Sequence, residues 1–330
     1  MEKALGKLTP DTQASGSMLP ALVGLNPYKT PNDCLESAFR AIDRSPNGST
    51  KAPFEYIEAA EWGNVFENPI LLETAKRLGC EINTNITEAV QHKTLPLAVS
   101  LDGILEGNGQ VIKTDSSKGI FCVDCESVTL TGKGVAEAKL TGAGQSSTPA
   151  PYRGPIQVQG SMMCTGYEWA AIGTLFKGTK LHIFLLKQDQ IAFNKLAADI
   201  RDFQARLDAY KLRKEENWYP AMTPNDAQNI YSSSDEWQAP VELPGELSEL
   251  ALELADANRA EKAVKSLKAE INTRIMDFMK GSNVAKVMEN GEEVGRITWP
   301  MRSERQEYYV PAKPAKRAAS LSVKIYQDSQ

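Results

Sequence analysis

Residues 95–140 carry β-type patterning between helical stretches, and this order of elements decides the class of fold. β-Branched and alternating apolar residues, separated by glycines, predict strands in this block. The helical stretches around it predict an α/β (α+β) protein. The expected strands span 95–105, 110–114, 120–130 and 135–140.

The rest of the N-terminal two thirds is predicted to be mainly helical. Apolar residues recur there at steps of three and four, and glycines or prolines interrupt the pattern. One continuous apolar run, residues 180–186, predicts a buried strand instead. The expected helices span 17–23, about 31–42, 57–78, 154–176 and 193–210.

The C-terminal third has a different organisation. Residues 246–280 predict one long helix, with an apolar stripe that includes Val264 and Leu267. Asn290-Gly291 lies between two short β-type segments and predicts a hairpin. We therefore expect three parts, which are a domain at 1–220, a proline- and serine-rich linker or lid at 221–245, and a C-terminal region at 246–330.

Composition limits the classes of function. The chain has 330 residues, with 37 Lys and Arg against 42 Asp and Glu, so its formal net charge is −5. This balance argues against a protein that is coated in positive charge and binds nucleic acids indiscriminately, but it allows a local basic groove. Only two histidines are present, which disfavours histidine-rich zinc sites and Ser-His-Asp catalysis. The basic tail at 302–324 is a candidate for contact with a nucleic-acid backbone or a partner.

Cysteine usage indicates a reducing compartment. Five cysteines, an odd number, are scattered along a long chain, which is not the pattern of a disulfide framework. Cys122-x-x-Cys125 has no second pair at zinc-ribbon spacing, so a structural or incidental role is favoured over a metal site. No signal peptide or membrane span is predicted, so we expect a cytoplasmic protein.

Glu137-Ala138-Lys139 is the candidate centre of the chemistry. Residues two apart in a strand point to the same face, so the carboxylate and the ammonium share one surface. Such a pair can hold a hard metal ion and a water molecule, although alone it more often forms a surface salt bridge. Asp102 lies in an apolar strand-like stretch, and Glu67 lies in a helix that carries large apolar groups. Together the three acids and the lysine could surround a divalent cation.

These residues occur in an order that resembles a known family. Their series is similar to the lambda-exonuclease and YqaJ-like phage recombinases of the PD-(D/E)xK nuclease superfamily. The resemblance covers roughly residues 14–190, and the long helix and hairpin look like a common C-terminal extension. It therefore implies a PD-(D/E)xK nuclease core, with a central mixed β-sheet flanked by helices. The matching motifs are Gly16-Ser17-Met18, Gly24 to Pro31, Gly63-x-x-x-Glu67, Leu101-Asp102-Gly103, Glu137-Ala138-Lys139 and Gln157-Val158-Gln159-Gly160.

The resemblance implies a role for each matching residue. Asp102 and Glu137 would be the principal ligands of Mg²⁺, with Mn²⁺ as a substitute, and Glu67 would support the same metal site. Lys139 would orient the attacking water, and Gln157 would lie close to the scissile phosphate. Ser17 would bind a DNA 5′-phosphate, whereas the residues alone favour an ordinary helix N-cap.

The implied activity is 5′→3′ degradation of one strand of double-stranded DNA. The 3′ single-stranded tail would pass to a single-strand annealing protein during phage-type recombination, in the cytoplasm of a bacterial host. The family includes ring-shaped trimers, so the resemblance also allows a homo-oligomeric ring. Two alternatives remain, namely a non-catalytic DNA-end-binding scaffold and a Cas4-like nuclease that cuts single strands or internal sites.

The sequence departs from the family pattern at two places. A tyrosine often precedes the glutamine by three positions, but Gly154 stands there and the nearest tyrosine is Tyr152. The segment between Asp102 and Glu137 is also unusually long. One of its acids could therefore lie near the metal instead, the candidates being Asp115, Asp124 and Glu126.

Overall fold

The computed structural model describes residues 9–10, 12–44, 58–231 and 239–301. The chain divides into two compact units, Met1–Asp226 and Ala227–Gln330. The expected basic tail at 302–324 lies outside the described residues. The division falls within the segment that we expected to be a linker, where a short helix, α6 (Pro224–Ile230), forms.

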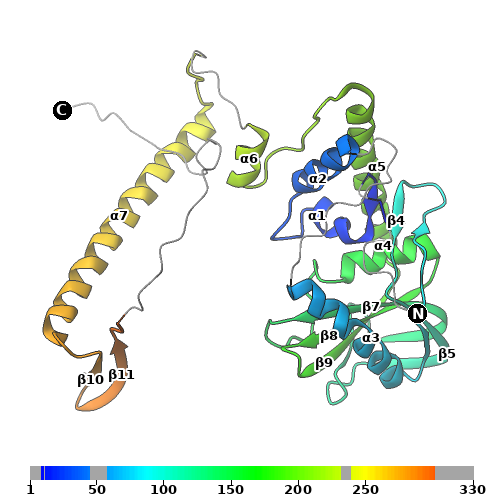
Figure 1. Cartoon of the computed structure of the whole chain (residues 1–330), viewed down its shortest axis with the longest axis horizontal. Coiled ribbons are helices and arrows are strands. Elements are labelled where there is room, and N and C mark those ends of the chain that lie inside the picture. The colour runs from blue at the N-terminus through cyan, green and yellow to red at the C-terminus, as the bar shows by residue number, and fades with distance from the viewer. Residues whose placement is uncertain (1–8, 11, 45–57, 232–238, 302–330) are drawn as a thin grey trace. The chain divides into compact units, whose positions relative to one another are not determined.

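A six-stranded mixed sheet forms the centre of the first unit (Figure 1). β7–β8 and β6–β9 are parallel pairs, and the other neighbours are antiparallel. The expected α/β class with a central mixed sheet is confirmed. In spatial order the strands are β2 (Glu81–Asn83), β5 (Gly103–Lys113), β7 (Ser127–Thr141), β8 (Trp169–Phe176), β9 (Lys180–Lys187) and β6 (Ile120–Cys122).

Helices cover both faces of this sheet, as Figure 1 shows. The helix α3 (Glu58–Leu78) buries its C-terminal half against the face that carries Ala136. The helices α4 (Pro155–Thr165) and α5 (Gln190–Arg213) pack on the opposite face, which carries Val135. Because side chains alternate along a strand, residues 135, 137 and 139 of β7 all belong to the α4 face.

The N-terminal elements extend the layer on the α4 side. A small sheet has the order β1 (Ala14–Ser15), β4 (Leu97–Val99) and β3 (Val90–Gln91). The chain then forms a 3₁₀ turn, η1 (Gly16–Met18), followed directly by α1 (Leu19–Leu22). The helix α2 (Pro31–Arg44) completes this layer and buries its apolar side in the same core.

The expected helix at 154–176 is wrong in its second half. α4 ends at Thr165 because Gly166 adopts a left-handed conformation with φ of 76°. Residues 169–176 form β8, which lies between β7 and β9 with nearly every residue buried. A strand that is covered on both faces has no polar alternation, so its apolar run resembles a buried helix in sequence.

Residues 214–226 return from α5 to the start of α2, where Asp226 anchors them. The carboxylate is 3% exposed and accepts hydrogen bonds from Thr30 Oγ1, Asn32 Nδ2 and the Met222 N–H at 2.9–3.0 Å. Asn32 also exchanges two hydrogen bonds with the backbone of Tyr219. These contacts are internal to the first unit.

The second unit contains the expected long helix and hairpin. α7 (Gly245–Met279) is followed by β10 (Val284–Glu289) and β11 (Glu292–Thr298), which pair antiparallel. Asn290 and Gly291 have positive φ values of 51° and 85°, as a tight hairpin turn requires. Among the described residues, no helix combines the length and apolarity needed to cross a bilayer.

Candidate active site

Glu137 and Lys139 form the centre of the site on β7. Their side chains share the α4 face, and Lys139 Nζ lies 2.5 Å from Glu137 Oε1. The Glu137 side chain is 2% exposed, and that of Lys139 is 27% exposed. The pair is therefore not a solvated surface salt bridge, because the carboxylate is enclosed by the fold.

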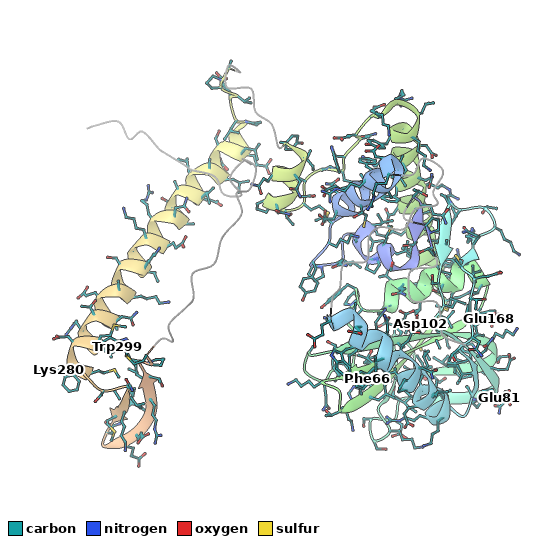
Figure 2. The ribbon with its side chains drawn as sticks, in the orientation of Figure 1. Phe66, Glu81, Asp102, Glu168, Lys280 and Trp299 are labelled. Atoms are coloured by element: carbon teal, nitrogen blue, oxygen red, sulfur yellow. The ribbon has the colours of Figure 1, made fainter. Side chains whose placement is uncertain are left out.

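Asp102, which is labelled in Figure 2, lies directly before β5. Gly103 pairs with Ala136, and this register brings Asp102 beside Glu137 on the same face. Asp102 Oδ2 accepts a hydrogen bond from the Ala138 N–H at 2.9 Å. Burial, followed by the charge of Glu137, raises the pKa of the Asp102 carboxyl well above its usual range.

Gln157 reaches the same site from the first turn of α4. Its Oε1 accepts a hydrogen bond from Lys139 Nζ at 3.0 Å. The helix starts at Pro155 after Gly154, whose φ is 111°. A Cβ at Gly154 would lie only 2.9 Å from Ile172 Cδ1 of β8, so the glycine allows the helix start to approach the sheet closely.

Glu67 contributes its charge from α3. The residue lies N-terminal to the part of this helix that packs on the sheet and is half-buried. Its negative charge raises the pKa of Asp102 and also that of Lys139, as a minor effect in each case. The structure thus brings the four residues Glu67, Asp102, Glu137 and Lys139 within electrostatic reach.

The electrostatics of the site favour a protonated lysine. Burial by itself lowers the pKa of Lys139, but the charges of Glu137 and Asp102 outweigh it and raise the pKa above its ordinary value. One ammonium faces three acidic side chains here. When ionised, these acids would leave the site with excess negative charge, which a bound cation would offset.

A divalent cation fits the donor set of this site. Glu137 Oε2 is buried and has no hydrogen-bond partner among the described residues. Within the same residues, no group of three or more His, Cys, Asp or Glu side chains is placed so that it could hold a metal ion. Mg²⁺ does not need three protein ligands, because it commonly binds one or two carboxylates and completes its octahedron with water and substrate phosphates.

Ser17 lies on the surface near this site. It is the middle residue of the 3₁₀ turn η1, which packs against α4, and its Oγ lies 3.4 Å from Ser15 Oγ. The N-cap residue of η1 is Ser15 and that of α1 is Met18, and neither side chain makes a capping hydrogen bond. The alternative interpretation of Ser17 as an ordinary N-cap is therefore wrong.

The other acids that we considered lie elsewhere. β5 and β7 remain paired from Gly103 opposite Ala136 to Lys113 opposite Ser127, about 30 Å at 3.3 Å per residue. Asp115, Asp124 and Glu126 follow the far end of this ribbon, away from Asp102. Asp115 instead accepts hydrogen bonds from Ser117 in its own turn.

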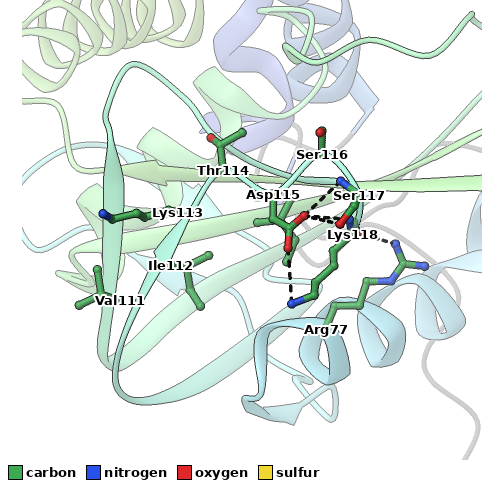
Figure 3. A pocket seen from close by; sticks show the side chains of 10 residues that line it. Arg77, Val111, Ile112, Lys113, Thr114, Asp115, Ser116, Ser117 and Lys118 are labelled. Atoms are coloured by element: carbon green, nitrogen blue, oxygen red, sulfur yellow. Dashed lines mark hydrogen bonds and ion pairs between the residues drawn. The ribbon is translucent and has the colours of Figure 1, made fainter.

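A hollow of about 560 Å³ lies at that far end (Figure 3). Arg77 points toward it, but its guanidinium already donates to Glu73 Oε1 and to the carbonyls of Lys118 and Leu181. Lys118 is paired with Asp115. The charged groups named here are thus engaged with one another, and the hollow adds no residue to the site.

Sequence reasoning missed one cluster beside the start of α4. The rings of Tyr28 and Tyr152 meet edge to face at 5.7 Å, and Arg153 Nε donates to the Tyr152 hydroxyl at 3.1 Å. Hydrogen bonding to Arg153 and to Tyr28 lowers the pKa of Tyr152. The sequence signal that could have identified this cluster is Tyr152-Arg153, which comes directly before Gly154-Pro155, where α4 begins.

Residues 11–168 match the model of the YqaJ-like viral recombinase domain. Among curated protein sequences, none matches this chain significantly. An alkaline exonuclease (LHK-Exo) from Laribacter hongkongensis is a structural neighbour with 13% identity, covering 62% of this chain and 91% of its own, at a TM-score of 0.44. A phage-related exonuclease from Haemophilus somnus 129PT has 14% identity, covers 62% of this chain and 96% of its own, and has a TM-score of 0.40.

Proposed function

Because residues 11–168 form a YqaJ-like viral recombinase domain, we propose that this protein is a deoxyribonuclease of phage-type recombination. Hydrolysis of the phosphodiester would take place at Asp102, Glu137 and Lys139. The observation that carries the proposal is the buried Glu137 carboxylate, which pairs with Lys139 through one oxygen and lacks a hydrogen-bond partner among the described residues at the other. A cation beside an incoming phosphate would satisfy that oxygen.

Asp102 and Glu137 would hold Mg²⁺ or Mn²⁺, with Glu67 in support. Carboxylate oxygens are the ligands that these hard ions prefer. The bound ion would supply Lewis acidity and positive charge at the scissile phosphate. Asp102 is held in place for this role by its hydrogen bond from the Ala138 N–H, so its orientation follows from the pairing of β5 with β7.

Lys139 and Gln157 would position the reacting groups. Lys139 Nζ already donates to Glu137 and Gln157, and its remaining N–H can hold the attacking water or a phosphate oxygen. Because Gln157 Oε1 accepts from Lys139, its Nε2 is the group that can donate to the phosphate. Both residues are thus suited to orienting the substrate and stabilising developing charge.

We extend the proposal to 5′→3′ degradation of one strand of duplex DNA. Ser17 supports this direction, because its exposed hydroxyl lies on η1, which packs against the helix that carries Gln157. A 5′-phosphate bound there would orient the strand end relative to the site. The 3′-tailed product is the substrate that a single-strand annealing protein would take.

The direct test uses the full-length protein, linear duplex DNA and Mg²⁺. We expect release of nucleotides from 5′-phosphorylated ends, its loss in EDTA, and its near-complete loss in Asp102→Asn and Lys139→Met. Glu126→Gln is a matched control, since it removes an acid at the far end of the β5–β7 ribbon. Wild-type rates in both Asp102→Asn and Lys139→Met would contradict the assignment.

Metal binding is measured separately from turnover. Titration with Mn²⁺, followed by electron paramagnetic resonance, should show a site that is weakened in Asp102→Asn and Glu137→Gln and unchanged in Glu126→Gln. A protein that binds duplex ends but neither binds Mn²⁺ nor hydrolyses DNA would instead be a recombination scaffold. Products that are internal cuts would favour the endonuclease alternative.

A further inference from the structure

Two tyrosines and one arginine form a cluster at the start of α4. The rings of Tyr28 and Tyr152 lie nearly perpendicular, at an interplanar angle of 73°. Arg153 Nε donates to the Tyr152 hydroxyl at 3.1 Å, and the guanidinium lies 5.3 Å from the centre of the Tyr152 ring. We call these three residues the Tyr-Arg cluster. None of them belongs to the proposed metal ligands or to the pair of Lys139 and Gln157.

The Tyr-Arg cluster is close to the site along the chain. Arg153 lies two residues before α4, and Gln157 is the third residue of that helix, where it accepts a hydrogen bond from Lys139 Nζ. A separation of four residues spans at most about 14 Å. A DNA strand whose scissile phosphate lies beside Lys139 and Gln157 would therefore have its neighbouring nucleotides within reach of the cluster.

Arg153 has donors that are not engaged. Its side chain is half-buried, and no carboxylate in the described part of the chain forms a salt bridge with it. A guanidinium carries five N–H donors, and among the described residues only the Nε–H of Arg153 has an acceptor. The two Nη groups are thus available to a ligand. Paired N–H groups with a permanent positive charge are suited to binding phosphate oxygens.

Tyr28 presents its ring to solvent. Its side chain is 77% exposed, and its turn is held by a hydrogen bond from the Tyr28 N–H to Asn26 Oδ1 at 2.9 Å. Tyr152 contacts the ring without covering it. An open aromatic ring can stack on a nucleobase, but only on an unpaired one, because the bases of a duplex already stack on one another.

We propose that the Tyr-Arg cluster is a subsite for one unpaired nucleotide of the strand that the site cleaves. Tyr28 stacks on the base, and the guanidinium of Arg153 binds the phosphate. Tyr152 is a positioning residue, because it contacts both of the other side chains. The subsite rests on the proposed deoxyribonuclease function and specifies its substrate, which is a DNA end with an unpaired nucleotide next to the scissile phosphate.

DNA binding in Ca²⁺, with recovery of intact DNA as a check, measures the subsite without turnover. The probes are two duplexes with the same short 5′ tail, one with its bases and one with abasic sugars. Full-length wild-type protein should bind the tail with bases about tenfold more tightly, because one base stacks on Tyr28. Fluorescence anisotropy gives both affinities. Wild-type protein that does not distinguish the two tails, or binds neither, would overturn the proposal.

Substitutions of Tyr28 test the stacking. Tyr28→Leu keeps an apolar side chain but has no ring, so it should weaken binding of the tail with bases about tenfold and leave the abasic tail unaffected. Tyr28→Phe retains the ring and should keep the wild-type discrimination. Circular dichroism should be unchanged in both variants, since the side chain is exposed. Equal loss on both tails in Tyr28→Leu would exclude a contact with the base and overturn the assignment.

Substitution of Arg153 tests the phosphate contact. Arg153→Gln should weaken binding of both tails alike, because the abasic tail keeps its phosphates. It should also lower the slope of log affinity against log salt concentration by about one. The matched control is Lys113→Gln, which removes an exposed positive charge at the far end of β5 and should leave the slope unchanged. A wild-type slope in Arg153→Gln would overturn the phosphate contact.

The positioning role of Tyr152 has its own readout. Tyr152→Phe keeps the ring and removes the acceptor of Arg153 Nε, so it should weaken binding of both tails a few-fold. In protein that already carries Arg153→Gln, the same change should have no further effect, because the hydroxyl acts through the guanidinium. Additive losses would show that it acts independently and would overturn the positioning role.

These affinities separate the subsite from the hydrolysis. Discrimination between the two tails without any release of nucleotides in Mg²⁺ would contradict the nuclease assignment alone. Release of nucleotides by a protein that binds both tails equally would contradict the subsite alone.

Discussion

Lys139 Nζ donates a hydrogen bond to Gln157 Oε1 at 3.0 Å and thereby joins β7 to the first turn of α4. The two residues belong to different layers of the fold, and Lys139 Nζ also donates to Glu137, so one ammonium links the three side chains. It also orients the glutamine amide, since the oxygen is directed to the lysine. The geometry of the site thus depends on how α4 packs on the sheet.

Gln157→Leu should slow hydrolysis about 10- to 100-fold while leaving stability almost unchanged, because the side chain is half-buried and its proposed task is orientation. Lys139→Met should cost more, about 10²- to 10⁴-fold. The control is Gln159→Leu. Gln159 is 7% exposed and bonds to the backbone of Lys187 and Asp189, so this variant should lose stability rather than rate. Single-turnover assays and urea unfolding separate the two effects.

Ser17→Ala should reduce the preference for 5′-phosphorylated over 5′-hydroxyl ends about tenfold, because a hydrogen bond to a charged phosphate would be lost. Activity on 5′-hydroxyl duplex serves as the internal control and should change little. Equal loss on both substrates would assign Ser17 a structural role. Competition assays with both end chemistries measure the ratio directly.

Gly134→Ala should destabilise the protein by about 1–3 kcal/mol through overpacking. The added Cβ would lie 2.4 Å from the ring of Trp169, which is 1% exposed. Gly63→Ala is the matched control, since the new methyl group meets nothing within 4 Å in α3. It should be neutral or stabilising by up to about 1 kcal/mol. Urea unfolding of both variants provides the comparison.

Asp226→Ala should cost about 2–5 kcal/mol, because it leaves the buried side-chain amide of Asn32 and the N–H of Met222 without their acceptor. Asp226→Asn preserves the size and one acceptor oxygen and should cost less. Hydrogen exchange should then show residues 214–226 opening more readily in the alanine variant than in the asparagine variant. Unchanged protection in both would contradict the anchoring role.

The contact between Tyr210 and Asp43 should make stability depend on pH at both extremes. The Tyr210 hydroxyl donates to Asp43 Oδ2 at 2.7 Å, and Lys214 also binds this carboxylate. Hydrogen bonding to Lys214 and Tyr210 lowers the pKa of Asp43. The ionised carboxylate therefore stabilises the fold fully above the ordinary aspartate pKa, and this stabilisation is lost as pH falls through the lowered pKa. Hydrogen bonding to Asp43 raises the pKa of Tyr210 to about 12, so stability is lost as pH rises from about 10 to 12.

Asp43→Asn removes both effects. Its difference in melting temperature from the wild type should be largest near neutral pH and should shrink at both acidic and alkaline pH. A difference that stays constant across this range would show that the contact does not titrate as described. Thermal unfolding across the pH range is the measurement.

Several features could be predicted from local pattern alone. The long helix α7 and the Asn290-Gly291 hairpin follow from an uninterrupted helical period and a tight-turn dipeptide. The pairing of Glu137 with Lys139 follows from the two-residue period of a strand. Each of these depends only on neighbours in the chain.

Other features were decided by tertiary structure. Residues 169–176 form a strand because they lie between β7 and β9, and burial on both faces erases the alternation that would identify them. Asp102 reaches Glu137 through the register of β5 with β7, and the same register carries Asp115 to the far end of the ribbon. Periodicity reports which side of an element is buried. Which buried side chains meet is decided only when distant segments pair. The number of residues between two segments does not specify the register of their strands or the packing of their helices.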